Sequence, residues 1–88
     1  MKKHLVKRKG HNEEYDERKV YASCYAAALN AHYNEKEAEE FAKVVTTKVN
    51  KWIKTKAQIS SDDIRHQIII AMHDPEVALL YKHHLDLS

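Results

Sequence analysis

Hydrophobic residues recur along most of the chain at spacings of three and four, which is the period of a helix that buries one face. This pattern predicts four helices. The first is expected over residues 17–33, directly after Asp16, whose carboxylate can accept hydrogen bonds from the free N–H groups of a first turn. Its apolar stripe consists of Val20, Cys24, Ala27 and Ala31.

The second helix is predicted to begin after Asn34 and to run to about Lys54. Asn34 stands three residues before Glu37, which is the spacing of a capping box, in which each side chain bonds the other residue's backbone N–H. One apolar stripe runs along this segment and consists of Ala38, Phe41, Val45, Val49 and Trp52.

Two further helices follow. In the sequence "ISSDDI", Ser60 or Ser61 can cap a third helix that carries Ile64, Ile68 and Met72. The sequence "HDPEV" opens the fourth helix, with Asp74 as its cap and Pro75 in the first turn, where a missing N–H has no cost. The expected inner face of this helix consists of Val77, Leu80, Tyr81 and His84.

The opening segment, "HLVKRKGHNEEY", has no helical stripe. Lys9 and Gly10 fit a two-residue hairpin turn that requires a positive φ, and Gly10 is the only glycine in the chain. Because an isolated hairpin is marginally stable, we expect a third short strand, for which residues 57–59 are the candidate. The predicted fold is mainly α: four helices in a bundle, with a small β-hairpin or three-stranded β cap at the N-terminus.

Length and composition limit the remaining choices. Eighty-eight residues without a linker or repeat indicate one domain over residues 1–88. No apolar run reaches the roughly 20 residues of a membrane span, and the first residues lack the apolar core of a signal peptide. We therefore expect a cytoplasmic protein that does not insert into membranes.

The lone cysteine and the charges are less decisive. Cys24 lies at helical spacing among apolar residues, so a buried structural thiol is the favoured interpretation and a catalytic thiol the alternative. The formal net charge is +2, from 15 basic and 13 acidic side chains, which does not identify a nucleic-acid-binding protein. Basic residues nevertheless gather in the first nine positions.

The basic opening suggests a phosphate site. A single glycine excludes the usual glycine-rich nucleotide loops, which need several. A hairpin carrying Lys7 and Arg8, followed by a helix N-terminus with Lys19 one turn inside, can still hold a polyphosphate. The alternative is a surface hairpin whose charge is balanced by nearby acidic residues.

The stretch "LVKRKGHNEEYDERKV" resembles the opening of the ATP-cone domain, in which an apolar residue precedes a Lys-Arg-Asp/Asn-Gly turn and a helix that carries lysine. The later "ISSDDIRHQI" and "DPEVALLYKHH" resemble the third and fourth helices of that family. The resemblance covers residues 4–84. ATP-cones are regulatory modules that bind ATP or dATP, known from ribonucleotide reductases and from the repressor of their genes.

The resemblance implies a nucleotide site between the β cap and the helices. Leu5 and Val6 would lie near the base or sugar, whereas Lys7, Arg8 and the helical Lys19 would meet the phosphates. Ser61 corresponds to a hydroxyl residue at the start of the third helix, and Arg65 stands where some members place a base-contacting histidine. The full set implied by the resemblance is Leu5, Val6, Lys7, Arg8, Lys9, Gly10, Glu13, Asp16, Lys19, Ser61 and Arg65, with Glu13 and Asp16 holding the ribose or a neighbouring basic group.

One position departs from the family pattern: Lys9 replaces the usual Asp or Asn beside the turn glycine. Metal and catalytic sites have less support. His66 and His73 lie two helical turns apart, too far to share an ion, and no nucleophile, base and orienting group form a plausible set. We therefore predict neither a metal site nor an enzyme.

The favoured hypothesis is a free-standing ATP-cone that binds ATP or dATP, with or without Mg²⁺, and controls self-association or a partner protein. A second hypothesis is a small helical interaction module whose basic start contacts nucleic acid. A third is a degenerate cone that keeps the fold for protein contact alone. Salt-sensitive binding of DNA or RNA that is lost with the basic start would favour the second hypothesis.

Overall fold

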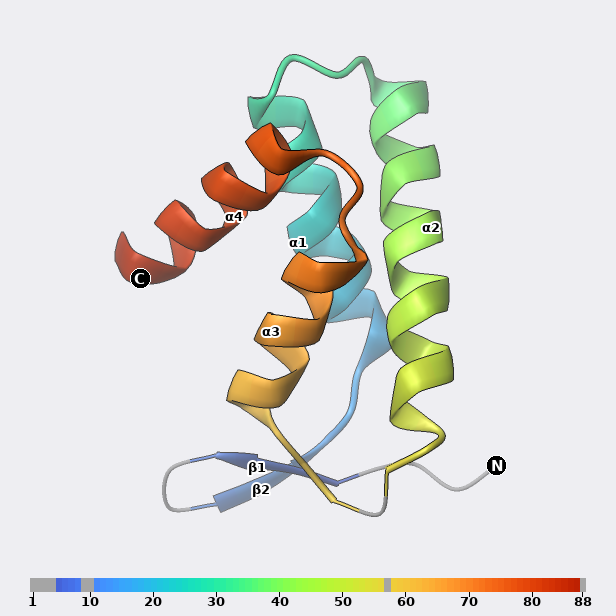
Figure 1. The fold of residues 1–88 in the computed structure, drawn as a ribbon, viewed down its shortest axis with the longest axis vertical. Helices are drawn as coiled ribbons and strands as arrows, with labels where there is room; N and C mark the ends of the chain where they lie inside the picture. The colour runs from blue at the N-terminus through green and yellow to red at the C-terminus, as the bar shows by residue number, and fades with distance from the viewer. Residues whose placement is uncertain (1–4, 9–10, 57, 88) are drawn as a thin grey trace.

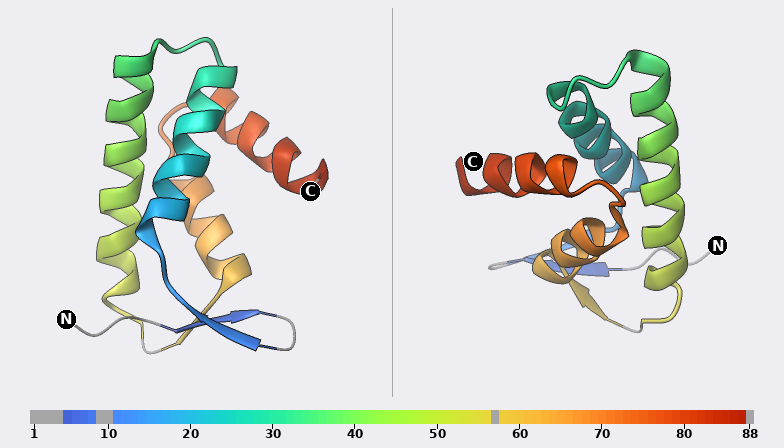
Figure 2. Two further views of the ribbon diagram at one scale, coloured as in Figure 1. Left: turned by 180° about the vertical axis from the view of Figure 1, so that it is seen from behind. Right: turned by 45° about the horizontal axis from the view of Figure 1, so that its top comes forward.

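A computed structural model shows three helices standing over a small sheet and a fourth helix at the far end of the molecule (Figure 1). It describes residues 5–8, 11–56 and 58–87, with side chains over 14–56 and 58–83. Figure 2 shows from two further directions that helix α4 projects away from the other three. The elements are β1 (Leu5–Arg8), β2 (His11–Glu14), α1 (Glu17–Asn30), α2 (Glu35–Ile53), β3 (Ile59–Ser60), α3 (Ser61–Ala71) and α4 (Pro75–Leu87).

The sheet joins segments from distant parts of the chain in the order β2-β1-β3. Strands β1 and β2 are antiparallel, with Leu5 opposite Glu14 at the open end of the hairpin. The proposed turn residues, Lys9 and Gly10, lie outside the described residues. Strand β3 runs parallel to β1 and places Lys7 beside Ser60, the residue before α3. Strand β1 is thereby held next to the start of α3.

The helix starts confirm the predicted caps. The Asp16 side chain accepts a hydrogen bond from the Arg18 N–H at the start of α1. Asn34 opens α2 and Ser60 opens α3, each in a complete capping box. Asp74 accepts from the Glu76 N–H at the start of α4. These short polar side chains satisfy N–H groups that have no partner inside the helix, which is why the four starts could be read from sequence.

Helix α1 ends earlier than predicted, at Asn30 rather than at residue 33. His32 adopts a left-handed conformation with φ 70°, and the Tyr33 N–H returns to the Ala28 carbonyl. This is the geometry of a Schellman-type helix end, for which glycine is the usual residue. Because histidine stands there instead, the sequence carried no signal for the end of the helix.

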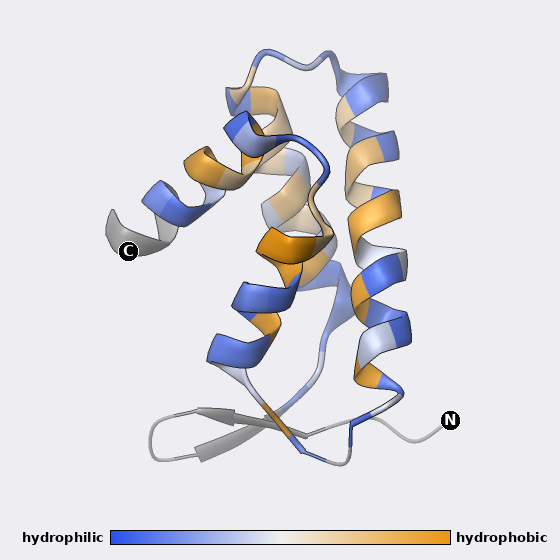
Figure 3. Ribbon diagram, viewed as in Figure 1, coloured by the Kyte–Doolittle hydropathy of each residue, from blue (hydrophilic) through white to orange (hydrophobic). Residues whose placement is uncertain are grey.

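The core lies where α1, α2 and α3 face one another, and Figure 3 shows apolar residues on these inward sides. The predicted stripe of α2 is confirmed at Ala38, Phe41, Val45 and Val49. At its end Ile53 is buried, whereas Trp52 is only half-buried and packs against the core from outside. Cys24 is fully buried, as the structural interpretation predicted, and burial raises the pKa of its thiol to about 12.

The mainly helical class is confirmed. Across the described ranges, none of the helices is long and apolar enough to cross a bilayer. Packing leaves the N-terminal ends of α1 and α3 near the β cap at the same end of the molecule (Figure 1), which sets the position of the cavity described next.

Candidate functional site

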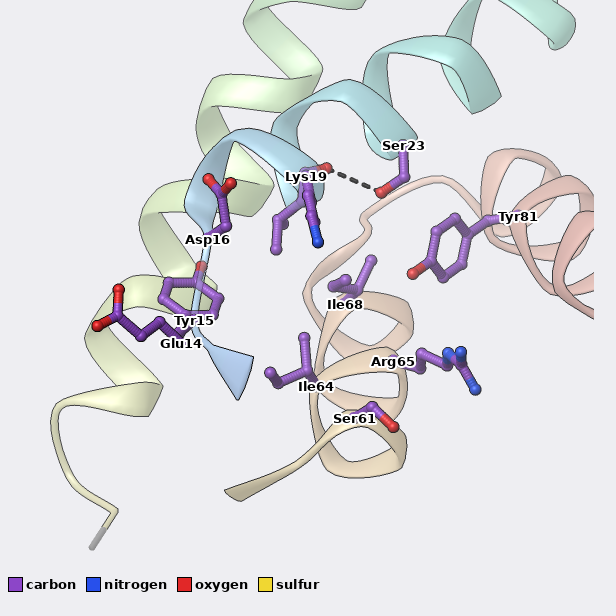
Figure 4. A pocket seen from close by; sticks show the side chains of 11 residues that line it. Glu14, Tyr15, Asp16, Lys19, Ser23, Ser61, Ile64, Arg65, Ile68 and Tyr81 are labelled. Carbon is purple, nitrogen blue, oxygen red and sulfur yellow. Dashed lines mark hydrogen bonds between the residues drawn. The ribbon is translucent and has the colours of Figure 1, made fainter. Parts of the chain in front are cut away.

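A cavity of about 180 Å³ lies between α1 and α3, beside the end of β2 and the inner face of α4 (Figure 4). Figure 4 shows Lys19 of α1 and Tyr81 of α4 directed toward the space in front of α3. Ile64 and Ile68 form an apolar wall on α3. The complete lining is Glu14, Tyr15, Asp16, Lys19, Val20, Ser23, Ser61, Ile64, Arg65, Ile68 and Tyr81.

Two helix N-termini open onto this cavity. Asp16, the cap of α1, and Ser61, the first residue of α3, both line it. A helix N-terminus carries partial positive charge because its first N–H groups have no intrahelical partner. The side chains of Asp16 and Ser60 satisfy one such group each. Two converging N-termini make the cavity an environment that favours an anion.

Charged side chains of both signs surround the cavity. Lys19 and Arg65 contribute positive charge, and Glu14 and Asp16 contribute negative charge. Asp16 is held by Arg18, whose Nε lies 3.1 Å from Oδ1, and these hydrogen bonds lower the pKa of the carboxyl. Arg65 Nη1 lies 3.3 Å from the exposed Asp62 carboxylate. Because this ion pair is solvent-exposed, it holds Arg65 only weakly.

Two tyrosines form opposite parts of the wall. The Tyr15 hydroxyl donates to Asn50 Oδ1 over 2.6 Å, and burial raises its pKa. Tyr81 is 4% exposed, and burial also raises its pKa, while the nearby Ser23 hydroxyl and Arg65 guanidinium oppose the rise. Both phenols are therefore neutral at physiological pH.

The structure brings together four of the residues proposed from sequence: Asp16, Lys19, Ser61 and Arg65 all line the cavity. A second group lies on the sheet at the same end of the molecule, with Leu5, Val6, Lys7 and Arg8 in β1 and Glu13 in β2. Lys7 is in register with Ser60, one residue before Ser61. Lys9 and Gly10 lie outside the described residues.

Sequence reasoning missed several residues of the lining. Tyr15, Ser23 and Tyr81 are uncharged, and no residue pattern assigned them to a ligand, although Tyr15 and Tyr81 lie within stretches that resemble the ATP-cone family. Their convergence depends on how α1, α3 and α4 pack. The one available signal was the position of Tyr81 on the predicted inner face of α4. That face was expected to pack against the other helices.

The described residues contain no group of three or more His, Cys, Asp or Glu side chains that could hold a metal ion.

A scan against protein-family models matches the ATP cone domain over residues 3–83, nearly the whole chain. The chain belongs to the ATP-cone family. The resemblance to this family is thereby confirmed, and the match reaches from the opening segment into α4. A comparison with curated proteins and one with solved structures gave no match.

Membership in the ATP-cone family implies a nucleotide-binding regulatory module. In this ATP-cone, the cavity at the N-termini of α1 and α3 combines two cations, hydroxyl groups and an apolar wall. These are the elements that the phosphates, sugar and base of a nucleotide require.

Proposed function

We propose that this ATP-cone binds ATP or dATP between the β cap and the helices, and that binding controls self-association or a separate partner protein. The observation that carries the proposal is the convergence of two helix N-termini, Lys19 and Arg65 on one cavity. Such an arrangement favours a polyanion over a neutral ligand. Lys7 and Arg8, on the strand next to the start of α3, supply further positive charge for the phosphates.

The cavity is smaller than the roughly 300–1,000 Å³ of a typical small-molecule pocket, so it holds only part of a nucleotide. In this proposal the base lies against Ile64, Ile68 and Arg65, and the phosphates extend from Lys19 toward β1. Binding would neutralise the positive charge shared by β1 and α1 and would stabilise the cap on the helices. The resulting change in the cap is the signal to a partner.

The test is thermal unfolding with ATP, dATP and GTP, each with and without Mg²⁺. Ligand at about 100 times its Kd raises the free energy of unfolding by about 2.7 kcal/mol. We expect stabilisation by the adenine nucleotides, and its loss in Lys7→Ala/Arg8→Ala and in Lys19→Ala. Lys36→Ala/Lys43→Ala is the matched control, because both lysines are exposed on α2, which contributes nothing to the described cavity lining.

Regulation is tested separately by measuring the molar mass in solution with and without saturating ATP. A change in mass supports control of self-association. An unchanged mass directs the search to a partner that is retained only in the presence of nucleotide. If a folded protein gains no stability from any nucleotide at millimolar concentration, the nucleotide proposal is wrong.

A further inference from the structure

A row of lysines on the outer side of α2 has no role in the site proposed above. The exposed residues Val44, Thr47, Lys48, Lys51 and Lys54 fall within about 120° of the helix circumference, and we call them the lysine face. None of the α2 residues lines the described cavity. From Phe41 to Ser61 the chain contains five lysines and no acidic residue.

The fold does not account for this row. Lys48, Lys51 and Lys54 follow one another at i,i+3 spacing, where like charges are neighbours on a helix and destabilise it by roughly 0.2–0.5 kcal/mol a pair. Lysine in the last turn complements the helix dipole, but that effect fades beyond one turn and does not extend to Lys48. Within the described residues, none of these three lysines takes part in an ion pair.

An acidic side chain of α1 contacts this part of α2. Glu17 Oε2 accepts a hydrogen bond from Asn50 Nδ2 over 2.7 Å, and that bond anchors the side of α2 next to the lysine face. The glutamates of α2 itself lie in its N-terminal half, at Glu35, Glu37, Glu39 and Glu40. The positive charge of the lysine face is therefore not neutralised along its own length.

We propose that the lysine face binds the phosphate backbone of duplex DNA without sequence preference. Lysine and threonine side chains are common donors to phosphate oxygens. Arg, Asn and Gln, which read base edges, are missing from this face, and no exposed aromatic ring offers a stacking platform for single-stranded bases. Lysine is depleted at protein–protein interfaces, which favours nucleic acid over an acidic protein surface.

The shape of α2 favours DNA over RNA. With 19 residues it is the longest helix, and it lies along one edge of the molecule (Figure 2). A helix about 10–12 Å in diameter can approach the wide major groove of B-form DNA, whereas the major groove of A-form RNA is too narrow. The lysine face then meets the phosphates at the groove edge.

Anisotropy of a labelled 20-base-pair duplex, measured in buffer without nucleotide, tests this proposal. Three lysine contacts predict that log K falls with log salt with a slope of about −2.7. Lys48→Gln/Lys51→Gln should weaken binding about tenfold and bring the slope to about −0.9. The matched control Lys36→Gln/Lys82→Gln removes the same net charge from exposed positions in the first turn of α2, about 18 Å from Lys48 along the helix axis, and on α4. It should stay within about twofold of the unmodified chain.

Further measurements distinguish binding at the lysine face from binding at other surfaces and from binding of other partners. Trp52, the only tryptophan, is half-buried beside the lysine face, so its fluorescence reports binding there directly. Lys7→Ala/Arg8→Ala should keep duplex binding, which separates the lysine face from the nucleotide site and from the basic start of the chain. The proposal is wrong if the two double glutamine variants lose the same affinity for the duplex, or if only Lys7→Ala/Arg8→Ala loses it. It is also wrong if the chain binds duplex RNA more tightly than duplex DNA, or binds polyglutamate as tightly as duplex DNA.

Discussion

The Tyr15 hydroxyl donates a hydrogen bond to Asn50 Oδ1 over 2.6 Å, joining the cavity wall to helix α2. Asn50 in turn donates through Nδ2 to Glu17 in the first turn of α1. This chain of two bonds connects the end of the β cap with both long helices. It also places a cavity residue in contact with the segment that carries the lysine face.

The Tyr15–Asn50 bond should contribute measurably to stability. Tyr15→Phe removes the hydroxyl and leaves a half-buried amide oxygen without its donor, so we expect the free energy of unfolding to fall by about 1 kcal/mol. Urea unfolding of Tyr15→Phe, Asn50→Ala and the double variant gives the coupling between the two side chains. Additive losses would show that the bond contributes nothing of its own.

A second hydrogen bond predicts how stability depends on pH. The Tyr33 hydroxyl donates to Asp74, and this bond is the main cause that lowers the pKa of Asp74 and raises that of Tyr33 to about 12. A lowered carboxyl pKa stabilises the fold above the unfolded value near 3.9, and this contribution is lost as pH falls further. A raised tyrosine pKa stabilises below pH 10, and this contribution is lost as pH rises toward 12.

The stability difference between the unmodified chain and Tyr33→Phe should therefore be greatest near neutral pH. It should narrow below about pH 4 and above about pH 10. Unfolding by urea at several pH values measures this difference. Tyr25→Phe is a suitable control at neutral and acid pH, because its hydroxyl makes no hydrogen bond among the described residues. Above about pH 10 it is no control, since burial and the nearby Glu35 raise the pKa of Tyr25 as well. A difference that is constant with pH would contradict the assigned role of Asp74.

Thr46 carries a buried hydroxyl without a hydrogen-bond partner in the described part of the chain, and the residue is 9% exposed. Thr46→Val replaces the hydroxyl by a methyl group of similar shape, so we expect stabilisation of about 1 kcal/mol. In a domain of this size the melting temperature would rise by about 4–8 °C. Thr47→Val, at the exposed neighbouring position, should change stability by less than about 0.5 kcal/mol.

The end of α1 is strained at His32, whose φ of 70° is unfavourable for a residue with a Cβ atom. His32→Gly removes that strain and gives up some entropy of the unfolded chain, so the net gain in stability should be about 0.5 kcal/mol. His32→Ala keeps the Cβ atom and should bring no gain. Thermal unfolding of both variants separates backbone strain from any interaction of the imidazole.

Arg65 provides a sharper test of how the proposed site holds the base. If its guanidinium stacks on adenine, Arg65→Ala should weaken ATP binding about tenfold, and Arg65→Lys should restore little, because an ammonium is not planar. Inorganic tripolyphosphate has no base, so its affinity should change little in Arg65→Ala. Isothermal titration with both ligands measures this contrast, and an equal loss for both would assign Arg65 to the phosphates.

The local signals in the sequence were sufficient for the helices but not for the site. Caps at Asp16, Asn34 and Ser60 act within three residues of themselves, so their effect could be predicted without knowing the tertiary fold. The end of α1 could not, since His32 occupies a position where glycine is the recognisable signal. The prediction of a helix end was therefore wrong where the residue type is not the one that usually adopts the backbone conformation found there.

The residues of the candidate site likewise fall into those that could be predicted from sequence and those that could not. Lys19 and Ser61 were found through a motif that lies next to helix starts, and the structure places both at one cavity. Tyr81 and Tyr15 reach that cavity through packing between elements far apart in the chain, and Tyr15 is fixed by a bond to Asn50 across 35 positions. No local pattern encodes such contacts.

The parallel pairing of β1 with β3 affects the order of folding. Helices α1 and α2 are neighbours in sequence and can pack early, whereas Val6 meets Ile59 only after the long loop between them has closed. We therefore expect the cap to be the last part to assemble and the first to open in a local unfolding event. Amide hydrogens of β1 should exchange with solvent before those of α2, and a nucleotide could enter through this opening without unfolding the helices.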